Sequence, residues 1–252
     1  MPTELANLVS LVGLRADRAV KLVSGGSSLR HDFDVNPQDF LDQAEFDFEF
    51  GGNAALLNAV TNAKRAITCQ IDQVLSCFGF KIARITYQDK IAQLAAMGFV
   101  APRILRRVSN TRNLLEHEYK APTEDQVAEA LDLAALFVEA SNRPLGMFMD
   151  EFDLVDKDEV LDHYSGKRGL SFSYRQKPDA KETISFAFRV IAYDNGETRP
   201  ELGVKPIAEP CFVANDSPYF APLVRLVVAG DNTARIDRAT SSLFMRLASG
   251  GA

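Results

Sequence analysis

Residues 53–78 read NAALLNAVTNAKRAITCQIDQVLSCF, and this stretch decides how the first half of the chain folds. Its apolar residues recur every three or four positions, the spacing that gathers side chains on one face of a helix. The positions are Leu56, Leu57, Val60, Ala63, Ile67, Ile71, Val74, Leu75 and Phe78. We therefore predict a long amphipathic helix that ends at Gly79 and packs against other helices.

The sequence on the N-terminal side of this helix also has helical spacing. Apolar residues between 5 and 20 predict a first helix of about five turns, and the Ser- and Gly-rich run at 24–28 is interpreted as a flexible connector. Asn36 followed by Pro37 has the pattern of an N-cap with proline in the first turn. A second helix is predicted from there to Gly51.

Three more helices are predicted on the C-terminal side. The first covers 85–98, and the second begins after Pro102 and ends near Ala121. The third opens with the capping-box pattern of Thr123 and Gln126 and ends at 142–144. Because none of this region has the pattern of a strand, residues 1–144 are predicted to form an all-α bundle.

Beyond Pro144 the spacing of apolar residues changes from helical to alternating. Residues 170–174 and 184–190 alternate apolar and polar side chains, which predicts two half-buried antiparallel strands before a turn at 194–196. A proline-rich loop follows, and Asp231 is positioned to cap a final helix. Two further segments are candidate strands: 146–154 and 222–229. The expected fold class is α+β, with a small antiparallel sheet and a C-terminal helix in a second domain, 145–252.

Composition narrows the class of protein. The 252-residue chain is 46% hydrophobic and 25% charged, the usage of a globular protein. It has no apolar run long enough for a membrane span and no signal-peptide pattern at its start. We expect a cytoplasmic protein that does not enter membranes. With three cysteines, three histidines and no cluster at metal-ligand spacing, we expect neither a metal nor a cofactor.

Charge is distributed unevenly along the chain, which has a formal net charge of −6. Residues 31–50 hold seven acids and no Lys or Arg, whereas residues 81–120 hold eight bases against three acids. Two interpretations stay open. The acidic stretch is a solvated face that packs near the basic one, or the basic segment is a surface that attracts phosphate.

The basic segment contains a group of polar residues at helical spacing. On an ideal helix, Arg112, Asn113, Glu116 and His117 fall within an arc of about 140°. The two leucines between them fall outside this arc, where they can anchor the helix in a bundle. The polar face offers a cation for phosphate, a titratable imidazole and an amide that can orient either.

The sequence RNLLEH at residues 112–117 resembles the signature of the HEPN superfamily, in which an Arg, often followed by Asn, precedes a His by four to six residues. The additional Tyr119 is similar to a subgroup of HEPN toxins that carry an Arg-x4-His-x-Tyr motif and are partnered by minimal nucleotidyltransferase antitoxins. The order of predicted helices agrees with the family. The resemblance covers residues 53–141 and implies a HEPN-like helical bundle.

The resemblance implies a metal-independent endoribonuclease that acts at a homodimer cleft. His117 is expected to be the general base for a ribose 2′-hydroxyl, Arg112 to hold the phosphate, and Asn113 to orient the imidazole or the phosphate. The products carry a 2′,3′-cyclic phosphate and a 5′-hydroxyl. Tyr119 corresponds to the residue that an antitoxin modifies with AMP. The expected RNA-binding or supporting residues are Glu116, Tyr119, Arg106, Arg107 and Lys120.

Several alternatives stay open at this point. The sheet domain and the acidic N-terminal segment are additions to a minimal toxin, so a larger antiphage-defence or stress-response protein fits equally well, with a neighbour-encoded partner. A non-catalytic HEPN module is the competing class, in which Arg112 and His117 grip a nucleotide or a protein and the second domain mediates assembly. The third alternative is a structural component of a larger assembly, in which Arg112 and His117 lie on a solvated face. Tyr119 on such a helix is also typical of a core-edge aromatic.

Overall fold

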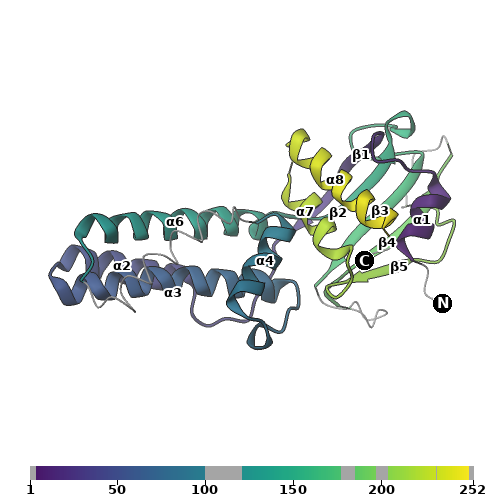
Figure 1. Ribbon diagram of the computed structural model, residues 1–252. Coiled ribbons are helices and arrows are strands. Elements are labelled where there is room, and N and C mark those ends of the chain that lie inside the picture. The colour runs from purple at the N-terminus through teal and green to yellow at the C-terminus, as the bar shows by residue number, and fades with distance from the viewer. Residues whose placement is uncertain (1–3, 100–120, 177–184, 197–203, 231, 250–252) are drawn as a thin grey trace. The chain divides into compact units, whose positions relative to one another are not determined.

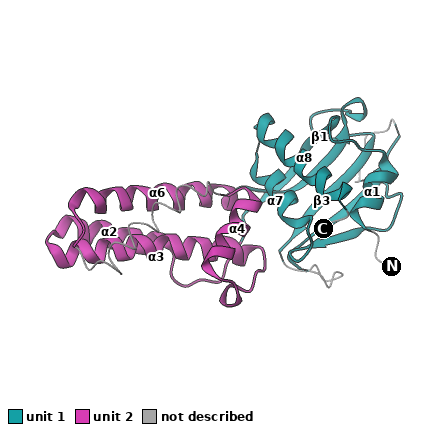
Figure 2. Cartoon of the chain, in the orientation of Figure 1, with its two compact units in different colours: residues 1–29, 147–252 teal, residues 30–146 magenta. Residues whose placement is uncertain are grey.

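The computed structural model describes residues 4–99, 121–176, 185–196, 204–230 and 232–249. It divides into two compact units, shown in Figure 2: residues 30–146, and residues 1–29 together with 147–252. The prediction that residues 1–29 belong to the helical domain is therefore wrong, because this segment contributes a strand to the sheet. In the order of the chain, the helical unit is inserted between two strands that are neighbours in the sheet.

The second predicted helix is confirmed as α2, Pro37–Phe50. Pro37 is its first residue, and the backbone N–H of Asn36 donates to the carboxylate of Asp39 at 2.7 Å. The helix ends at Gly51, whose φ of 74° is the left-handed conformation that glycine adopts at low cost. Local capping signals thus set both ends of α2.

The long helix α3, Asn53–Cys77, is the centre of the helical unit. Its buried face includes Ile67, Ile71 and Val74, each at most 1% exposed. Helices α2, α4 and α6 all pack against it. This arrangement explains why a 25-residue amphipathic helix is stable, since most helical stability comes from packing of the apolar face.

Two further helices of this unit follow in the described part. A single 3-10 turn, Ile82–Arg84, precedes α4, Tyr87–Met97. Helix α6, Glu124–Gly146, opens with the predicted capping box, in which Thr123 and Gln126 exchange hydrogen bonds of 3.0 and 3.3 Å. The predicted end at 142–144 is wrong, because α6 continues through Pro144. Proline at this position removes one backbone hydrogen bond and crowds the carbonyl of the preceding turn, a cost that falls within the last turn of the helix.

The other unit contains a five-stranded antiparallel sheet in the order β1-β2-β3-β4-β5. The structure thereby confirms the α+β class, the antiparallel pairing of the two predicted strands, and the candidate strand after Pro144. The short strand β5 lies within the predicted loop and was not expected. The strands are β1 Ala19–Ser27, β2 Phe148–Asp156, β3 Arg168–Arg175, β4 Ala187–Asp194 and β5 Cys211–Ala214.

The first predicted helix is correct only in its first two turns. Helix α1, Leu5–Val12, ends at Gly13, which has a φ of 69°. The chain then forms β1, including the Gly-rich run that the sequence analysis interpreted as a connector. Glycine suits this stretch, because β1 is irregular around Gly25 and a Cβ on Gly26 would make a tight contact of 3.1 Å with the carbonyl of Phe148.

An ion pair fixes the start of β1 against the end of β2. The guanidinium of Arg18 donates to the carboxylate of Asp156 at 2.7 Å, and this contact lowers the pKa of Asp156 to about 2. A second 3-10 turn, Lys157–Glu159, follows at this end of β2. The pair therefore reinforces the register in which Ala19 lies opposite Asp156.

One face of the sheet is apolar and carries the core of this unit. Phe152 of β2 stacks on Phe172 of β3 with ring centroids 4.8 Å apart. Phe220 of α7, Phe220–Val228, packs on Tyr174 and Phe188. Figure 1 shows α1, α7 and α8 in front of the sheet, and α8 packs on α7.

The C-terminal region requires two corrections. The candidate strand at 222–229 is wrong, because these residues belong to the helix α7. An apolar run of this length fits a buried strand or a buried helix equally well. The final helix, α8 Thr233–Ala248, is confirmed, but its N-cap is Asn232 and not Asp231. The ammonium of Lys21 donates to two carbonyls at the C-terminal end of α7, at 2.8 and 3.1 Å.

Candidate functional site

The predicted HEPN site lies outside the described residues. All of its members fall within residues 100–120, between α4 and α6, so their positions stay a prediction. They are Arg106, Arg107, Arg112, Asn113, Glu116, His117, Tyr119 and Lys120. Within the described part of the helical unit, one feature that can hold a ligand is a groove on α3.

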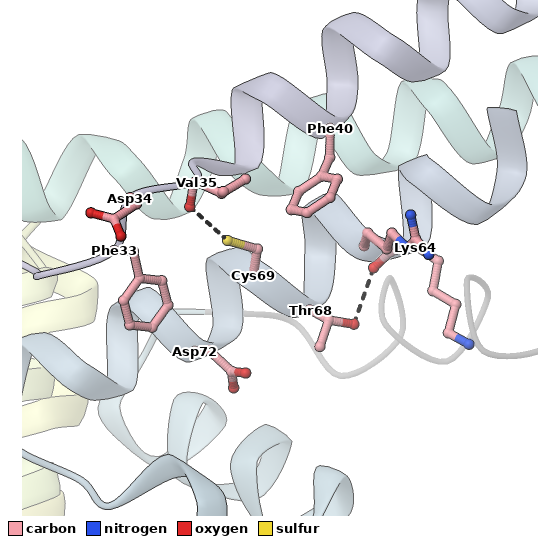
Figure 3. A pocket seen from close by; sticks show the side chains of 9 residues that line it. Phe33, Asp34, Val35, Phe40, Lys64, Thr68, Cys69 and Asp72 are labelled. Atoms are coloured by element: carbon pink, nitrogen blue, oxygen red, sulfur yellow. Dashed lines mark hydrogen bonds between the residues drawn. The ribbon is translucent and has the colours of Figure 1, made fainter. Parts of the chain in front are cut away.

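This groove is an open hollow of about 800 Å³ between α3 and the chain that leads into α2. In Figure 3 the rings of Phe33 and Phe40 flank the side chain of Cys69. The lining is mostly apolar, with charged groups at its rim. The lining residues are Phe33, Asp34, Val35, Phe40, Lys64, Arg65, Thr68, Cys69 and Asp72.

Helical spacing and two hydrogen bonds build the groove. Lys64, Thr68 and Asp72 follow one another at intervals of four, which places them in a line along α3. On the opposite wall, the chain before α2 is attached to α3, because the amide of Gln73 donates to Asn36 Oδ1 at 3.2 Å. The thiol of Cys69 contacts the carbonyl of Val35 at 3.5 Å. The groove is therefore held between a rigid helix and a capped turn.

Charged side chains of both signs stand at the rim. The ammonium of Lys90 on α4 lies 2.7 Å from the carboxylate of Asp72, and both side chains are mostly buried. Among the lining residues, Lys64 and Arg65 are matched in number by Asp34 and Asp72. The lining itself therefore carries no net formal charge.

Cys69 does not supply a nucleophile to this groove. Partial burial raises the pKa of its thiol, and the carboxylates of Asp72 and Asp39 raise the pKa further. The thiol therefore stays protonated at neutral pH, and thiols react as thiolates. Cys69 is half-buried, whereas Cys77 and Cys211 are buried, and all three cysteines are free thiols. The groove can therefore bind a ligand, but Cys69 supplies no thiolate to react with it.

A second polar cluster lies within the sheet unit. The hydroxyl of Tyr193, a residue with no exposed surface, donates to the carboxylate of Asp153 at 2.8 Å, and Asp153 is 7% exposed. Burial raises the pKa of Asp153, while its hydrogen bonds with Tyr193 and Ser171 oppose that rise. Both groups are shielded from solvent, and their hydrogen bond links β2 to β4 across the intervening strand β3.

In the described part of the chain, no group of three or more His, Cys, Asp or Glu residues is arranged to hold a metal ion. Among the helices described, none has both the length and the apolar character needed to cross a bilayer.

No compact motif in the sequence marks the groove, although one signal is present. The acidic stretch 31–50 also holds five phenylalanines, more than a purely solvated face would carry, and two of them, Phe33 and Phe40, line the groove. The apolar pattern of residues 53–78 gives no indication of a role for the line of Lys64, Thr68 and Asp72.

Comparison of the chain with protein families, with curated proteins and with solved structures found no match. A functional conclusion must therefore come from the motif in the sequence and from the chemistry of the described residues.

Proposed function

We propose that the protein is a metal-independent endoribonuclease of HEPN type that acts in toxin, antiphage-defence or stress biology. The observation that carries the proposal is the sequence of residues 112–119, in which Arg, Asn, His and Tyr occur together at HEPN spacing. The setting supports it, since the motif falls between two helices of a helical unit, α4 and α6, that both pack on α3.

The proposed reaction is a transfer within the RNA strand. His117 takes the proton of a 2′-hydroxyl while that oxygen forms a bond to the neighbouring phosphorus. Arg112 stabilises the negative charge that grows on the phosphoryl oxygens. The bond from phosphorus to the 5′-oxygen breaks, and this oxygen takes up a proton. The products are a 2′,3′-cyclic phosphate and a 5′-hydroxyl.

The proposed active form is a homodimer in which two copies of the motif face one cleft. Tyr119 is the proposed point of control, where a nucleotidyltransferase antitoxin or another neighbour-encoded protein silences the site. A hydroxyl that carries AMP would add negative charge next to the cation that has to bind phosphate. Modification at this position would thus block RNA binding.

The test compares wild type with the His117→Ala and His163→Ala variants on total RNA in EDTA. His163 lies in the loop before β3 of the sheet unit and is exposed, so it controls for loss of a histidine as such. We expect cleavage with cyclic-phosphate ends by wild type and by His163→Ala only. Light scattering and circular dichroism confirm that each protein is a folded dimer. Equal inactivity of all three folded proteins would refute the proposal.

A non-catalytic HEPN module is the second candidate. The groove on α3 favours it, because its lining offers apolar and charged side chains to a ligand and its one thiol stays protonated. In this case a nucleotide or a partner protein would raise the thermal stability of the protein without being cleaved. The sheet unit would then mediate assembly.

A further inference from the structure

We infer that the exposed face of α2 docks a basic amphipathic helix of a partner protein. The inference goes beyond the ribonuclease proposal and does not depend on it, because the face includes no residue of the HEPN motif or of the groove on α3. We call this face the α2 row. Its members, all exposed, are Asp42, Glu45, Phe46, Glu49 and Phe50.

Helical spacing places the members of the α2 row next to one another. Counted from Asp42, they occupy positions 0, 3, 4, 7 and 8, which fall within an arc of about 140° on an ideal helix. An amphipathic helix normally buries an arc of this kind. α2 instead buries a different side, which includes Leu41 and Ala44, and packs on α3 and α6. The α2 row is thus left open to a partner.

Two aromatic rings form the apolar part of the α2 row. Phe46 is 63% exposed and Phe50 is 80% exposed. They lie four positions apart and are therefore neighbours on the helix surface. Single exposed apolar side chains are ordinary on proteins, whereas adjacent ones mark interaction sites. Aromatic residues are enriched in the buried centre of protein interfaces, so this pair is suited to anchor a partner.

The charges of the α2 row determine the kind of partner. α2 carries five acids and no Lys or Arg. In the part of the chain that the structure describes, Glu45 and Glu49 form no salt bridge, and Asp42 accepts a hydrogen bond only from the neutral amide of Gln38. Like charges three or four positions apart repel one another. A partner that brings Lys or Arg to this face relieves the repulsion.

The bases on the helices packed against α2 lie away from the α2 row. They are Lys64, Arg65 and Arg143. The first two line the groove together with Phe40, which lies about 120° around α2 from Phe46. Arg143 follows Asn142, whose side chain bonds Gln70 of α3, next to the residue that contacts the chain before α2. Among the described residues, the bases of α3 and α6 therefore do not neutralise the α2 row.

The C-terminal end of α2 strengthens the preference for a cation. The last carbonyls of a helix carry partial negative charge and favour cations. The last turn of α2 instead holds Asp47 and Glu49 and no base. An arginine of the partner can also stack on the ring of Phe50, the last residue of the helix. The α2 row is about 12 Å long and straight, which suits a helix with Lys or Arg beside apolar residues along one face.

The first test measures the contribution of the aromatic pair. The full-length protein is titrated into a fluorescent Leu–Lys peptide, LKKLLKLLKKLLKL, and anisotropy gives Kd. Phe46→Ser and Phe50→Ser are compared with Leu136→Ser, because Leu136 is 64% exposed on α6 of the same unit. We expect each phenylalanine variant to raise Kd at least about tenfold and Leu136→Ser to leave it unchanged. All three side chains are exposed, so thermal unfolding should match wild type.

The second test measures the contribution of charge. Glu45→Gln/Glu49→Gln is compared with Asp132→Asn/Glu139→Gln, which removes two exposed acids on either side of Leu136 along α6. Both pairs change the net charge equally. We expect the α2 pair to raise Kd about fivefold at low salt and the α6 pair to leave it unchanged. High salt should remove the difference, because it screens exposed charges.

Three outcomes overturn the inference. In the first, wild type does not bind the peptide, or the α2 variants have no larger effect than their α6 controls. In the second, an analogue with Glu in place of every Lys binds equally well. In the third, sedimentation shows assemblies of wild type that Phe50→Ser dissociates, so that a second copy covers the α2 row. Peptide binding that only the α2 variants weaken supports the inference, whether or not the protein cleaves RNA.

Discussion

Removing the hydroxyl of Tyr193 is expected to destabilise the sheet unit in a pH-dependent way. That hydroxyl donates to the carboxylate of Asp153 at 2.8 Å, and neither residue is more than 7% exposed, which leaves little room for water to replace the bond. A hydrogen bond to a charged group contributes about 1.5–3 kcal/mol. We expect Tyr193→Phe to lower the free energy of unfolding by that amount at pH 7.

The pH dependence follows from the pKa of Asp153, which burial raises above its usual value. The folded state then holds the Asp153 proton more tightly than the unfolded state, so stability falls as pH rises through the folded pKa. Tyr193→Phe removes a hydrogen bond that limits the rise in the pKa of Asp153. In this variant the loss of stability with increasing pH therefore extends to a higher pH. At a pH below the folded pKa of Asp153 the carboxyl is protonated and the bond is a neutral one, so the cost there is about 0.5–1.5 kcal/mol.

The assay is urea unfolding followed by circular dichroism at pH 7 and pH 4. Tyr164→Phe serves as the control, because Tyr164 is 69% exposed and loses no buried partner. A cost of Tyr193→Phe equal to that of the control, or equal at both pH values, would refute the assignment of a buried charged hydrogen bond. Repeating the measurement in an Asp153→Asn background gives the coupling between the two residues.

Three further outcomes follow from the structure. Gly169→Ala places a Cβ 2.5 Å from a carbonyl of β2 and is expected to cost about 1–3 kcal/mol in thermal unfolding, whereas Gly146→Ala meets nothing within 4 Å and is expected to be neutral. Lys90→Met leaves the carboxylate of Asp72 without its partner at 2.7 Å, so we expect a lower melting temperature; an unchanged melting temperature would contradict a stabilising role for this pair. Replacement of residues 30–146 by a four-residue turn is expected to leave a sheet unit that folds, with circular dichroism of β type; an unfolded product would contradict the division into two units.

Elements defined by local signals were predictable from the sequence. The start of α2 depends on Asn36 and Pro37, and the start of α6 on Thr123 and Gln126, all of which act within one helical turn. The alternation of apolar and polar residues in β3 likewise identifies a strand, and its apolar residues are the buried ones. In each case the residues that determine the structure lie next to one another in the chain.

Elements defined by distant partners were not predictable. β1 forms because β2 pairs with it, and β2 begins only at Phe148. Nothing near Gly25 and Gly26 in the sequence distinguishes a bulged strand from a connector. For α7, whose side chains are buried at six of nine positions, the apolar run suited a strand as well as a helix. Packing against the sheet decides that choice.

Of the two candidate sites, one is defined by adjacent residues and the other by residues that are distant in the sequence. The HEPN motif occupies eight adjacent residues and can be identified from sequence, and its geometry stays a prediction. The groove combines Phe33 and Phe40 with Lys64, which come together only when α2 packs on α3. A site made of side chains from two elements has no compact sequence signature.

The position of the helical unit in the chain couples it to the sheet. Ser27 pairs with Phe148, so residues 30–146 form one long connection between adjacent strands. If this unit were unfolded, closing its 117 residues instead of a four-residue turn would cost about 3 kcal/mol more in chain entropy. A folded helical unit holds its own ends in place and removes most of that cost. A ligand that binds the folded helical unit would stabilise that unit and, through this connection alone, also the sheet.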